Sequence, residues 1–200
     1  ELYWIKDNKV IDKHRVIVGK PSNSTPDIIS EINQVVINPD WSVPQSIIKG
    51  ELKHKSSGYL SKYDIFQNGN KVNPGRVKWN AGNIRIVQPP GPTNALGNIK
   101  FLFKNNHSVY LHDTPSTNLF ANSVRAYSHG CVRVQNPLEL GINLLKRDGI
   151  EISMDSVQSI IETRKTNTIN LKNKMPIYIQ YYTSTAIDQD QPSYYPDLYN

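Results

Sequence analysis

The sequence contains a single cysteine, Cys131, and only two methionines in 200 residues. A lone cysteine has no partner within the chain, so an internal disulfide is excluded, and a chain of this length can bury a core without one. No apolar run approaches the ~18 residues that are needed to cross a bilayer. The chain begins Glu-Leu-Tyr-Trp, without a methionine or a basic leader, so we expect it to be a piece of a longer protein.

The sequence also lacks a basic tract. It has 23 basic and 17 acidic residues, a formal charge of +6, but the basic residues are scattered along the chain. No zinc-finger, heptad or RNA-binding pattern accompanies them, so no nucleic-acid partner is expected. The net positive charge instead favours weak attraction to anionic partners, including carboxylate-rich polymers.

Most of the chain consists of short strand-forming runs separated by proline, glycine and asparagine. Apolar and β-branched residues alternate with polar ones in these runs, as in half-buried strands. The predicted strands are residues 14–19, 30–38, 83–88, 98–103, 108–112 and 175–183. They indicate a mainly β fold with a few helices, arranged as an antiparallel sandwich or a barrel-like sheet system.

Two helices are predicted after the cysteine. The first spans residues 136–149, with Asn136 as its N-cap. The second runs over about 155–164, with Asp155 and Gln158 as a capping pair.

The segment 40–83 differs from the rest of the chain because it is polar, irregular and punctuated by proline and glycine. A loop of this length is uncommon in a compact domain unless it is functional. Its aromatic residues, such as Trp41, need a surface to pack on, which argues against a flexible loop. We interpret 40–83 as an insertion, with short helices around 46–51 and 58–63, in one domain that covers residues 1–200.

The lone cysteine lies in polar, basic surroundings, in the stretch RAYSHGCVRV at residues 125–134. A thiol becomes nucleophilic when a nearby base or positive charge favours the thiolate. His129 lies two residues before Cys131, and His112 lies nineteen residues before it, at the end of a predicted strand. Arg133 adds positive potential that should lower the thiol pKa.

Strand alternation bears on where His112 points. It predicts that Tyr110 and His112 share the polar face of the run 108–112, opposite its apolar residues. Gly130 lets the backbone turn sharply, and the N–H groups of Gly130 and Cys131 could face a developing oxyanion. The alternative is a structural histidine and a buried, inert cysteine.

A metal site is the main competing chemistry. Its possible ligands are His107, His112, His129 and Cys131. No pair of them has the spacing of CxxC or of a helical HExxH motif, so neither a metal nor a cofactor is expected.

The stretch YLHDTPSTNLFANSVRAYSHGCVRV, residues 110–134, resembles the signature of the YkuD-type L,D-transpeptidases. That signature is a histidine followed, after a variable loop, by Ser/Thr-His-Gly-Cys, a hydrophobic residue and Arg or Asn. The segments VINPDWSVPQSI and PPGPTNALGNIKFLF resemble the large Gram-negative branch of the family, in which a lid is inserted in the catalytic domain. The resemblance implies a β-sandwich with the cysteine motif between sheet and helix, and with 40–83 as the lid.

The resemblance also implies roles for individual residues. Cys131 would attack the donor peptide, His112 would take the thiol proton and later activate the acceptor amine, and Asp113 would orient His112 through its backbone carbonyl. Trp41 and Tyr110 are substrate-lining candidates for which packing is the alternative. The other expected site residues are Ser128, His129 and Gly130, around the turn and the oxyanion, and Arg125 and Arg133, beside the substrate.

The function that the resemblance implies is L,D-transpeptidation of peptidoglycan in the periplasm. Cys131 would cleave the stem tetrapeptide after its third residue and release D-alanine, and an acceptor amine would resolve the thioester into a 3-3 cross-link. The expected partners are donor and acceptor stem peptides and, as acylating inhibitors, carbapenems.

Alternatives remain open at this stage. An L,D-carboxypeptidase or a wall-lipoprotein hydrolase would use the same fold and let water resolve the thioester. A non-catalytic wall-binding module would leave Cys131 unmodified. A sortase-like enzyme is disfavoured because the Thr-Leu-x-Thr-Cys pattern is absent. The sequence does not indicate an oligomeric state.

Overall fold

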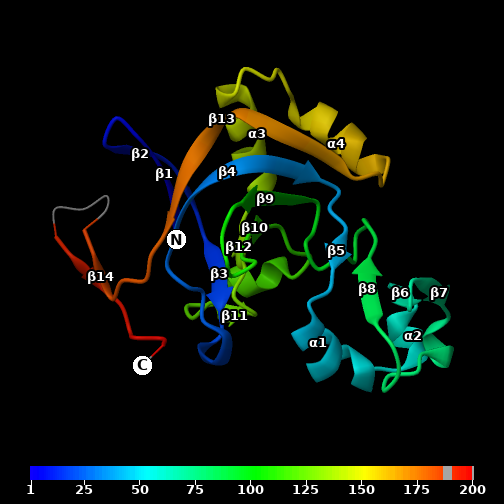
Figure 1. Ribbon diagram of the computed structural model, residues 1–200. Coiled ribbons are helices and arrows are strands. Elements are labelled where there is room, and N and C mark those ends of the chain that lie inside the picture. The colour runs from blue at the N-terminus through cyan, green and yellow to red at the C-terminus, as the bar shows by residue number, and fades with distance from the viewer. Residues whose placement is uncertain (187–190, 200) are drawn as a thin grey trace.

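A seven-stranded sheet forms the body of the protein in the computed structural model, which describes residues 1–186 and 191–199 (Figure 1). In spatial order its strands are β11 (Ala126–Ser128), β3 (Val16–Gly19), β12 (Val132–Val134), β10 (Leu111–His112), β9 (Ile99–Phe103), β4 (Ile28–Ile37) and β13 (Asn167–Ile179). The predicted mainly β fold with few helices is confirmed. The sheet is mixed, however, because β10 runs parallel to β12 and β11 runs parallel to β3.

Alternation along the strands builds the main hydrophobic core. In β9, Ile99, Phe101 and Phe103 are buried and the residues between them are half-buried. Helix α3 (Pro137–Arg147) packs on this strand. Gly141 permits the close approach, because a Cβ at that position would lie 2.5 Å from Ile99 Cδ1.

Both predicted helices are present, and Asn136 is the N-cap of α3 as predicted, but its side chain makes no capping bond and the predicted cap of α4 is wrong. Asn136 precedes α3 as expected, yet its backbone is left-handed, with φ 50° and ψ 48°, and its side chain makes no capping hydrogen bond. Helix α4 (Met154–Glu162) is capped by Ser153, whose hydroxyl accepts from the N–H three residues later at 3.1 Å. The expected pair, Asp155 and Gln158, lies inside the helix, whereas Ser153 has the extended backbone that directs a side chain at the free N–H groups.

An N-terminal hairpin escaped the sequence analysis. Strands β1 (Leu2–Lys6) and β2 (Lys9–His14) pair antiparallel, and Asp7 and Asn8 between them have φ angles of 49° and 58°. Two consecutive left-handed residues make the turn that suits a two-residue hairpin, and Asp and Asn tolerate that conformation well. The remaining short elements are β14 (Ser184–Thr185), β15 (Ser193–Tyr194), and the 3-10 helices η1 (Pro21–Asn23), η2 (Leu52–His54), η3 (Pro74–Arg76) and η4 (Thr117–Ala121).

Residues 41–88, called the insert below, form a separate small sheet with its own hydrophobic cluster. Its elements are β5 (Trp41–Ser42), α1 (Gln45–Gly50), α2 (Ser57–Leu60), β6 (Asp64–Gln67), β7 (Asn70–Val72) and β8 (Ile84–Gln88). The strand order is β5-β8-β6-β7, so the run 83–88, which was predicted as a strand after the insertion, belongs to the insert's own sheet. The short helices predicted in this region are present as α1 and α2.

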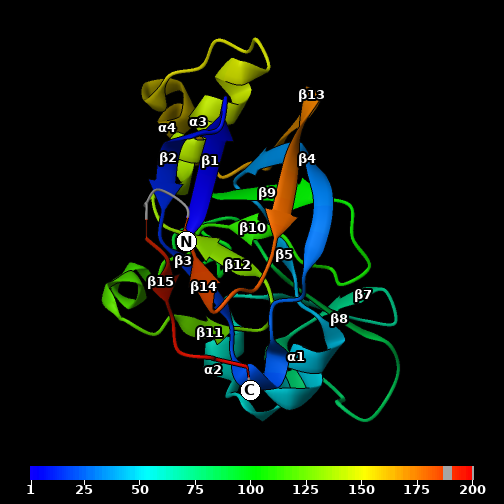
Figure 2. The ribbon, with the colours of Figure 1, turned by 90° about the vertical axis from the view of Figure 1, so that its left-hand side faces the viewer.

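The insert and helix α4 lie at opposite ends of the main sheet, as two perpendicular views show (Figures 1 and 2). The chain leaves the main sheet after β4 and returns to it at β9, so the insert is attached by two neighbouring connections. None of the helices in the described part of the chain has the length and apolar character of a membrane span.

Candidate active site

The pairing of β10 with β12 brings the two halves of the cysteine motif together. The strands run parallel, with His112 opposite Arg133. The N–H of Val132 donates to the carbonyl of Tyr110 at 3.1 Å, which sets Tyr110 beside Cys131 at the start of the pair. The eighteen residues between His112 and Cys131 therefore form a connection that returns to the neighbouring strand.

Strand alternation sorts the side chains of this pair between two faces. Four apolar side chains belong to the buried core, namely Val109, Leu111, Val132 and Val134. Because neighbours in a strand point to opposite faces, Tyr110, His112, Cys131 and Arg133 share the other face. The rings of Tyr110 and His112 are 5.6 Å apart between centroids. The predicted sharing of one face by Tyr110 and His112 is thus seen in the structure.

The imidazole of His112 is held by one hydrogen bond to the backbone. Its Nδ1–H donates to the carbonyl oxygen of Asp113 at 2.5 Å, as the sequence analysis anticipated. A carbonyl can only accept, so Nδ1 carries the proton and Nε2 keeps its lone pair. His112 is therefore fixed in the tautomer that can accept a proton at Nε2.

The loop at Asp113 is itself fixed by its carboxylate. The N–H groups of Asn98 and Thr114 donate to this carboxylate at 2.8 and 2.7 Å. Gly97 fits against it with a φ of +59°, and a Cβ there would lie 2.3 Å from Asp113 Oδ2. Burial raises the pKa of the Asp113 carboxyl against the opposing effect of the two hydrogen bonds. Gly97 and Asp113 thus lock the segment that aims His112.

Burial dominates the electrostatics of His112. It lowers the pKa of the imidazole to about 3, and the positive charges of Arg133 and Lys100 act in the same direction. The hydrogen bond to the Asp113 carbonyl opposes this shift without cancelling it. His112 is therefore neutral at neutral pH, with Nε2 unprotonated.

Cys131 is a half-buried free thiol. Its Sγ lies 3.8 Å from the carbonyl oxygen of Ser108, to which the S–H donates. Burial raises the thiol pKa, whereas hydrogen bonds from Tyr110 and the charge of Arg133 lower it by less. The prediction that Arg133 would depress the pKa is thus right for the effect of Arg133 and wrong for the thiol as a whole, because burial outweighs it.

Comparisons with known proteins agree with this geometry. Residues 1–152 match the L,D-transpeptidase catalytic domain of the YkuD family. This chain belongs to that family. It is also 34% identical over 209 residues to a Haemophilus influenzae protein named "Putative L,D-transpeptidase", and the match covers 100% of this chain and 42% of that protein. The chain thus spans less than half the length of this relative.

The YkuD motif turn is built around Ser128 and Gly130. The Ser128 hydroxyl donates to the carbonyl of Cys131 and accepts from the N–H of Gly130 at 3.1 Å. Gly130 has a φ of +112°, and its carbonyl accepts from Thr25 Oγ1 at 2.9 Å. The Gly130 N–H is therefore engaged and is not free for an oxyanion, contrary to the sequence-based expectation. Thr25, 105 residues away in the chain, is a buried brace of the turn that the sequence analysis did not find.

The side chains of His129 and Arg125 bind groups other than the thiol. His129 Nε2 lies 2.7 Å from Glu51 Oε1 at the end of helix α1, so the side chain bridges the motif to the insert. Arg125 donates to the carbonyls of Val16 and Asn122 and pairs with Glu1 at 3.1 Å. These contacts tie the loop before β11 to its surroundings, and they give Arg125 a structural role.

Trp41 brings the insert into contact with Tyr110. Burial, followed by the proximity of Cys131, raises the pKa of the Tyr110 hydroxyl, and a hydrogen bond from the Trp41 side chain opposes the shift. Arg133 on the same face keeps a buried Nε with no hydrogen-bond partner among the described residues. No group of three or more His, Cys, Asp or Glu side chains suited to a metal occurs in the described part of the chain.

Proposed function

We propose that this chain is a cysteine-dependent L,D-transpeptidase that forms 3-3 cross-links between peptidoglycan stem peptides. The observation that carries the proposal is that Cys131 and His112 both interact with Tyr110 beside the β10–β12 pair, with Nδ1 of the imidazole held by the Asp113 carbonyl. A histidine that is buried, neutral and fixed in one tautomer is suited to remove a proton from a neighbouring thiol.

In the first half-reaction, rotation of the thiol from the Ser108 carbonyl toward His112 lets Nε2 take its proton. Sγ attacks the carbonyl carbon of the third residue of the donor stem, which is bonded to the nitrogen of the terminal D-alanine. The carbonyl oxygen becomes negatively charged. The N–H of Cys131 makes no hydrogen bond to the described residues and is available to that oxyanion. The protonated His112 then gives its proton to the nitrogen of the departing D-alanine, leaving a thioester.

In the second half-reaction, neutral His112 removes a proton from the acceptor amine as that nitrogen attacks the thioester carbonyl. The C–S bond breaks, the sulfur takes up the proton, and an amide joins the two stems. The unpartnered Nε of Arg133 is a donor for a substrate carboxylate, since stem peptides carry several. Trp41 and the rest of the insert would act as a lid that keeps water from the thioester.

The test is incubation of the chain with soluble disaccharide-tetrapeptide, followed by mass spectrometry of protein and products. We expect a thioester on Cys131 and a cross-linked dimer, both of which disappear in Cys131→Ser. Tripeptide without dimer would instead identify a carboxypeptidase. Exposure to a carbapenem provides a second probe, and an unmodified thiol in both assays would favour a non-catalytic wall-binding module. Because peptidoglycan is the substrate, we place the working site of the protein in the periplasm.

A further inference from the structure

The net positive charge of the chain is concentrated in the insert. Residues 41–88 contain eight basic and two acidic residues, a formal charge of +6, which equals that of the whole chain. The rest of the chain has fifteen residues of each sign. Both acidic residues of the insert are also paired, Glu51 with His129 and Asp64 with Lys71. The insert is therefore a cationic module on a body that is formally neutral.

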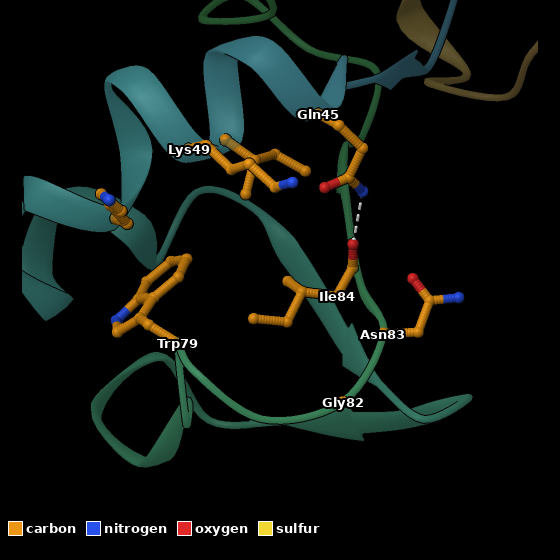
Figure 3. A pocket seen from close by; sticks show the side chains of 8 residues that line it. Gln45, Lys49, Trp79, Gly82, Asn83 and Ile84 are labelled. Carbon is orange, nitrogen blue, oxygen red and sulfur yellow. Dashed lines mark hydrogen bonds between the residues drawn. The ribbon is translucent and has the colours of Figure 1, made fainter.

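A cavity of about 230 Å³ opens within this cationic module, between α1 and the chain that leads into β8 (Figure 3). Figure 3 shows Gln45 and Lys49 reaching into the cavity from the helix and the Trp79 indole approaching from the other side. The complete lining is Gln45, Ile48, Lys49, Lys53, Trp79, Gly82, Asn83 and Ile84. It combines two cations, two amides and one aromatic ring, and it contains no acidic residue.

The walls of the cavity are held in place before any ligand arrives. Gln45 Nε2 donates to the carbonyl of Ile84 at 2.7 Å, which ties α1 to β8 and leaves the amide oxygen of Gln45 free to accept (Figure 3). The side chain of Gln67 donates to the Lys78 carbonyl at 2.8 Å and accepts from the Lys78 N–H at 3.2 Å, which fixes the segment next to Trp79. Such a preformed site binds without first ordering a loop.

The two lysines of the cavity are available to a ligand. No carboxylate of the described residues lies within 4 Å of the ammonium group of Lys49 or Lys53. Lys49 and Gln45 are four residues apart and share one face of α1. Glu51, two residues after Lys49, instead contacts His129 of the cysteine motif. The cavity is thus separate from the thiol face.

We propose that this cavity is a second, non-catalytic binding site for the carboxylate-bearing glycopeptide of peptidoglycan. The indole of Trp79 offers a flat face to a sugar ring, the lysines attract stem-peptide carboxylates, and the Gln45 and Asn83 amides pair with hydroxyl and acetamido groups. The identity of the ligand rests on the proposed function. A strand held here would be retained while another part of it occupies the catalytic face.

The three tryptophans allow both sites to be followed in one titration. Soluble disaccharide-tetrapeptide is added to the Cys131→Ala chain, and the indole N–H signals of Trp79 and Trp41 are monitored by NMR, with assignments from Phe substitutions. We expect saturable shifts of both signals. The double variant Lys49→Gln/Lys53→Gln should raise the Kd read at Trp79 by roughly threefold to tenfold, because each exposed charge pair contributes modestly, and should leave the Trp41 curve unchanged.

The matched control is Lys6→Gln/Lys9→Gln, which removes the same charge from exposed positions of the N-terminal hairpin. An unshifted Trp79 signal, or an equal weakening by both double variants, would overturn the proposal. A Trp79 response to anionic phospholipid vesicles but not to the glycopeptide would also overturn it. Acylation of Cys131 is measured separately, so a responding Trp79 in a chain whose thiol is never acylated refutes the proposed enzyme and leaves the binding site standing.

Discussion

The buried imidazole of His112 makes the stability of the fold depend on pH in a way that can be calculated. The perturbation is a change from pH 8 to pH 5, made on the wild-type chain and on His112→Asn. Folding lowers the pKa of His112 to about 3 because of burial, whereas the unfolded chain has the ordinary value of about 6.5. Between these values the unfolded state binds a proton that the folded state does not. The stability that depends on a neutral His112 is therefore fully present above the unfolded pKa and is lost progressively as the pH falls toward the folded pKa.

At pH 5 nearly every unfolded chain carries this proton and almost no folded chain does. The unfolded pKa lies about 1.5 units above pH 5, and this gap corresponds to about 2 kcal/mol of lost stability. A loss of this size in a protein of 200 residues corresponds to a decrease in Tm of roughly 4–8 °C. The variant has no imidazole at this position and cannot lose that amount, although an asparagine amide can still donate to the Asp113 carbonyl.

The assay is urea denaturation of both proteins at pH 8 and pH 5, with His112→Gln as a second variant if the first does not fold. The quantity of interest is the loss in free energy of unfolding between pH 8 and pH 5 in the wild type minus the same loss in the variant. The contributions of the other four histidines and of the carboxylates cancel in this difference. We expect the wild type to lose about 2 kcal/mol more than the variant. Equal losses would mean that His112 is accessible to protons in the folded state, and the argument for a buried neutral base would fail.

Three further predictions concern the supports of the site. Gly97→Ala should destabilise the chain by at least about 1 kcal/mol and slow carbapenem acylation of Cys131. The alanine would have a positive φ and a Cβ 2.3 Å from the Asp113 carboxylate. An acylation rate equal to that of the wild type would show that the loop relaxes freely. Thr25→Val removes the hydroxyl that braces the motif turn and should cost about 1–3 kcal/mol in chemical denaturation, whereas Thr25→Ser should retain most of the stability. Glu51→Gln should increase the rate at which a thiol reagent modifies the cysteine by up to roughly fivefold, since the exposed bridge contributes 1 kcal/mol at most. Adding His129→Asn to it should then have no further effect if the two residues act as a pair.

Cys131 and His112, the proposed nucleophile and base, could be picked out from the sequence because their chemistry is local. A lone cysteine beside glycine and arginine, and a histidine at the polar end of a strand, are readable from residue types and alternation. Their placement beside the same pair of strands depends on the parallel register of β10 and β12, which the intervening segment does not specify. The resemblance to the family signature implied that pairing in advance.

The missed features all depend on neighbours that are distant in the chain. Thr25 reaches Gly130 across 105 residues. The strand 84–88 was placed after the insertion, whereas its partners, β5 and β6, are part of the insert. The raised pKa of Cys131 has the same origin, because burial is a property of the packed structure and outweighs the visible charge of Arg133. Sequence patterns therefore indicated the candidate reacting groups, whereas the direction in which the pKa of Cys131 is shifted depends on the packed structure.

The raised pKa of the Cys131 thiol and the lowered pKa of the His112 imidazole have a consequence for the order of events in the proposed reaction. Full ionisation before the donor arrives is disfavoured, because burial opposes both the thiolate and the imidazolium. A negative charge forming on sulfur raises the proton affinity of the adjacent imidazole, so proton transfer and attack on the donor support each other. The same neutrality serves the second step, in which His112 must accept a proton from an amine while the thioester is intact. An imidazole that was protonated before the reaction would be unable to do this. The burial that makes the folded state less stable in acid thus also keeps His112 unprotonated for both proposed half-reactions.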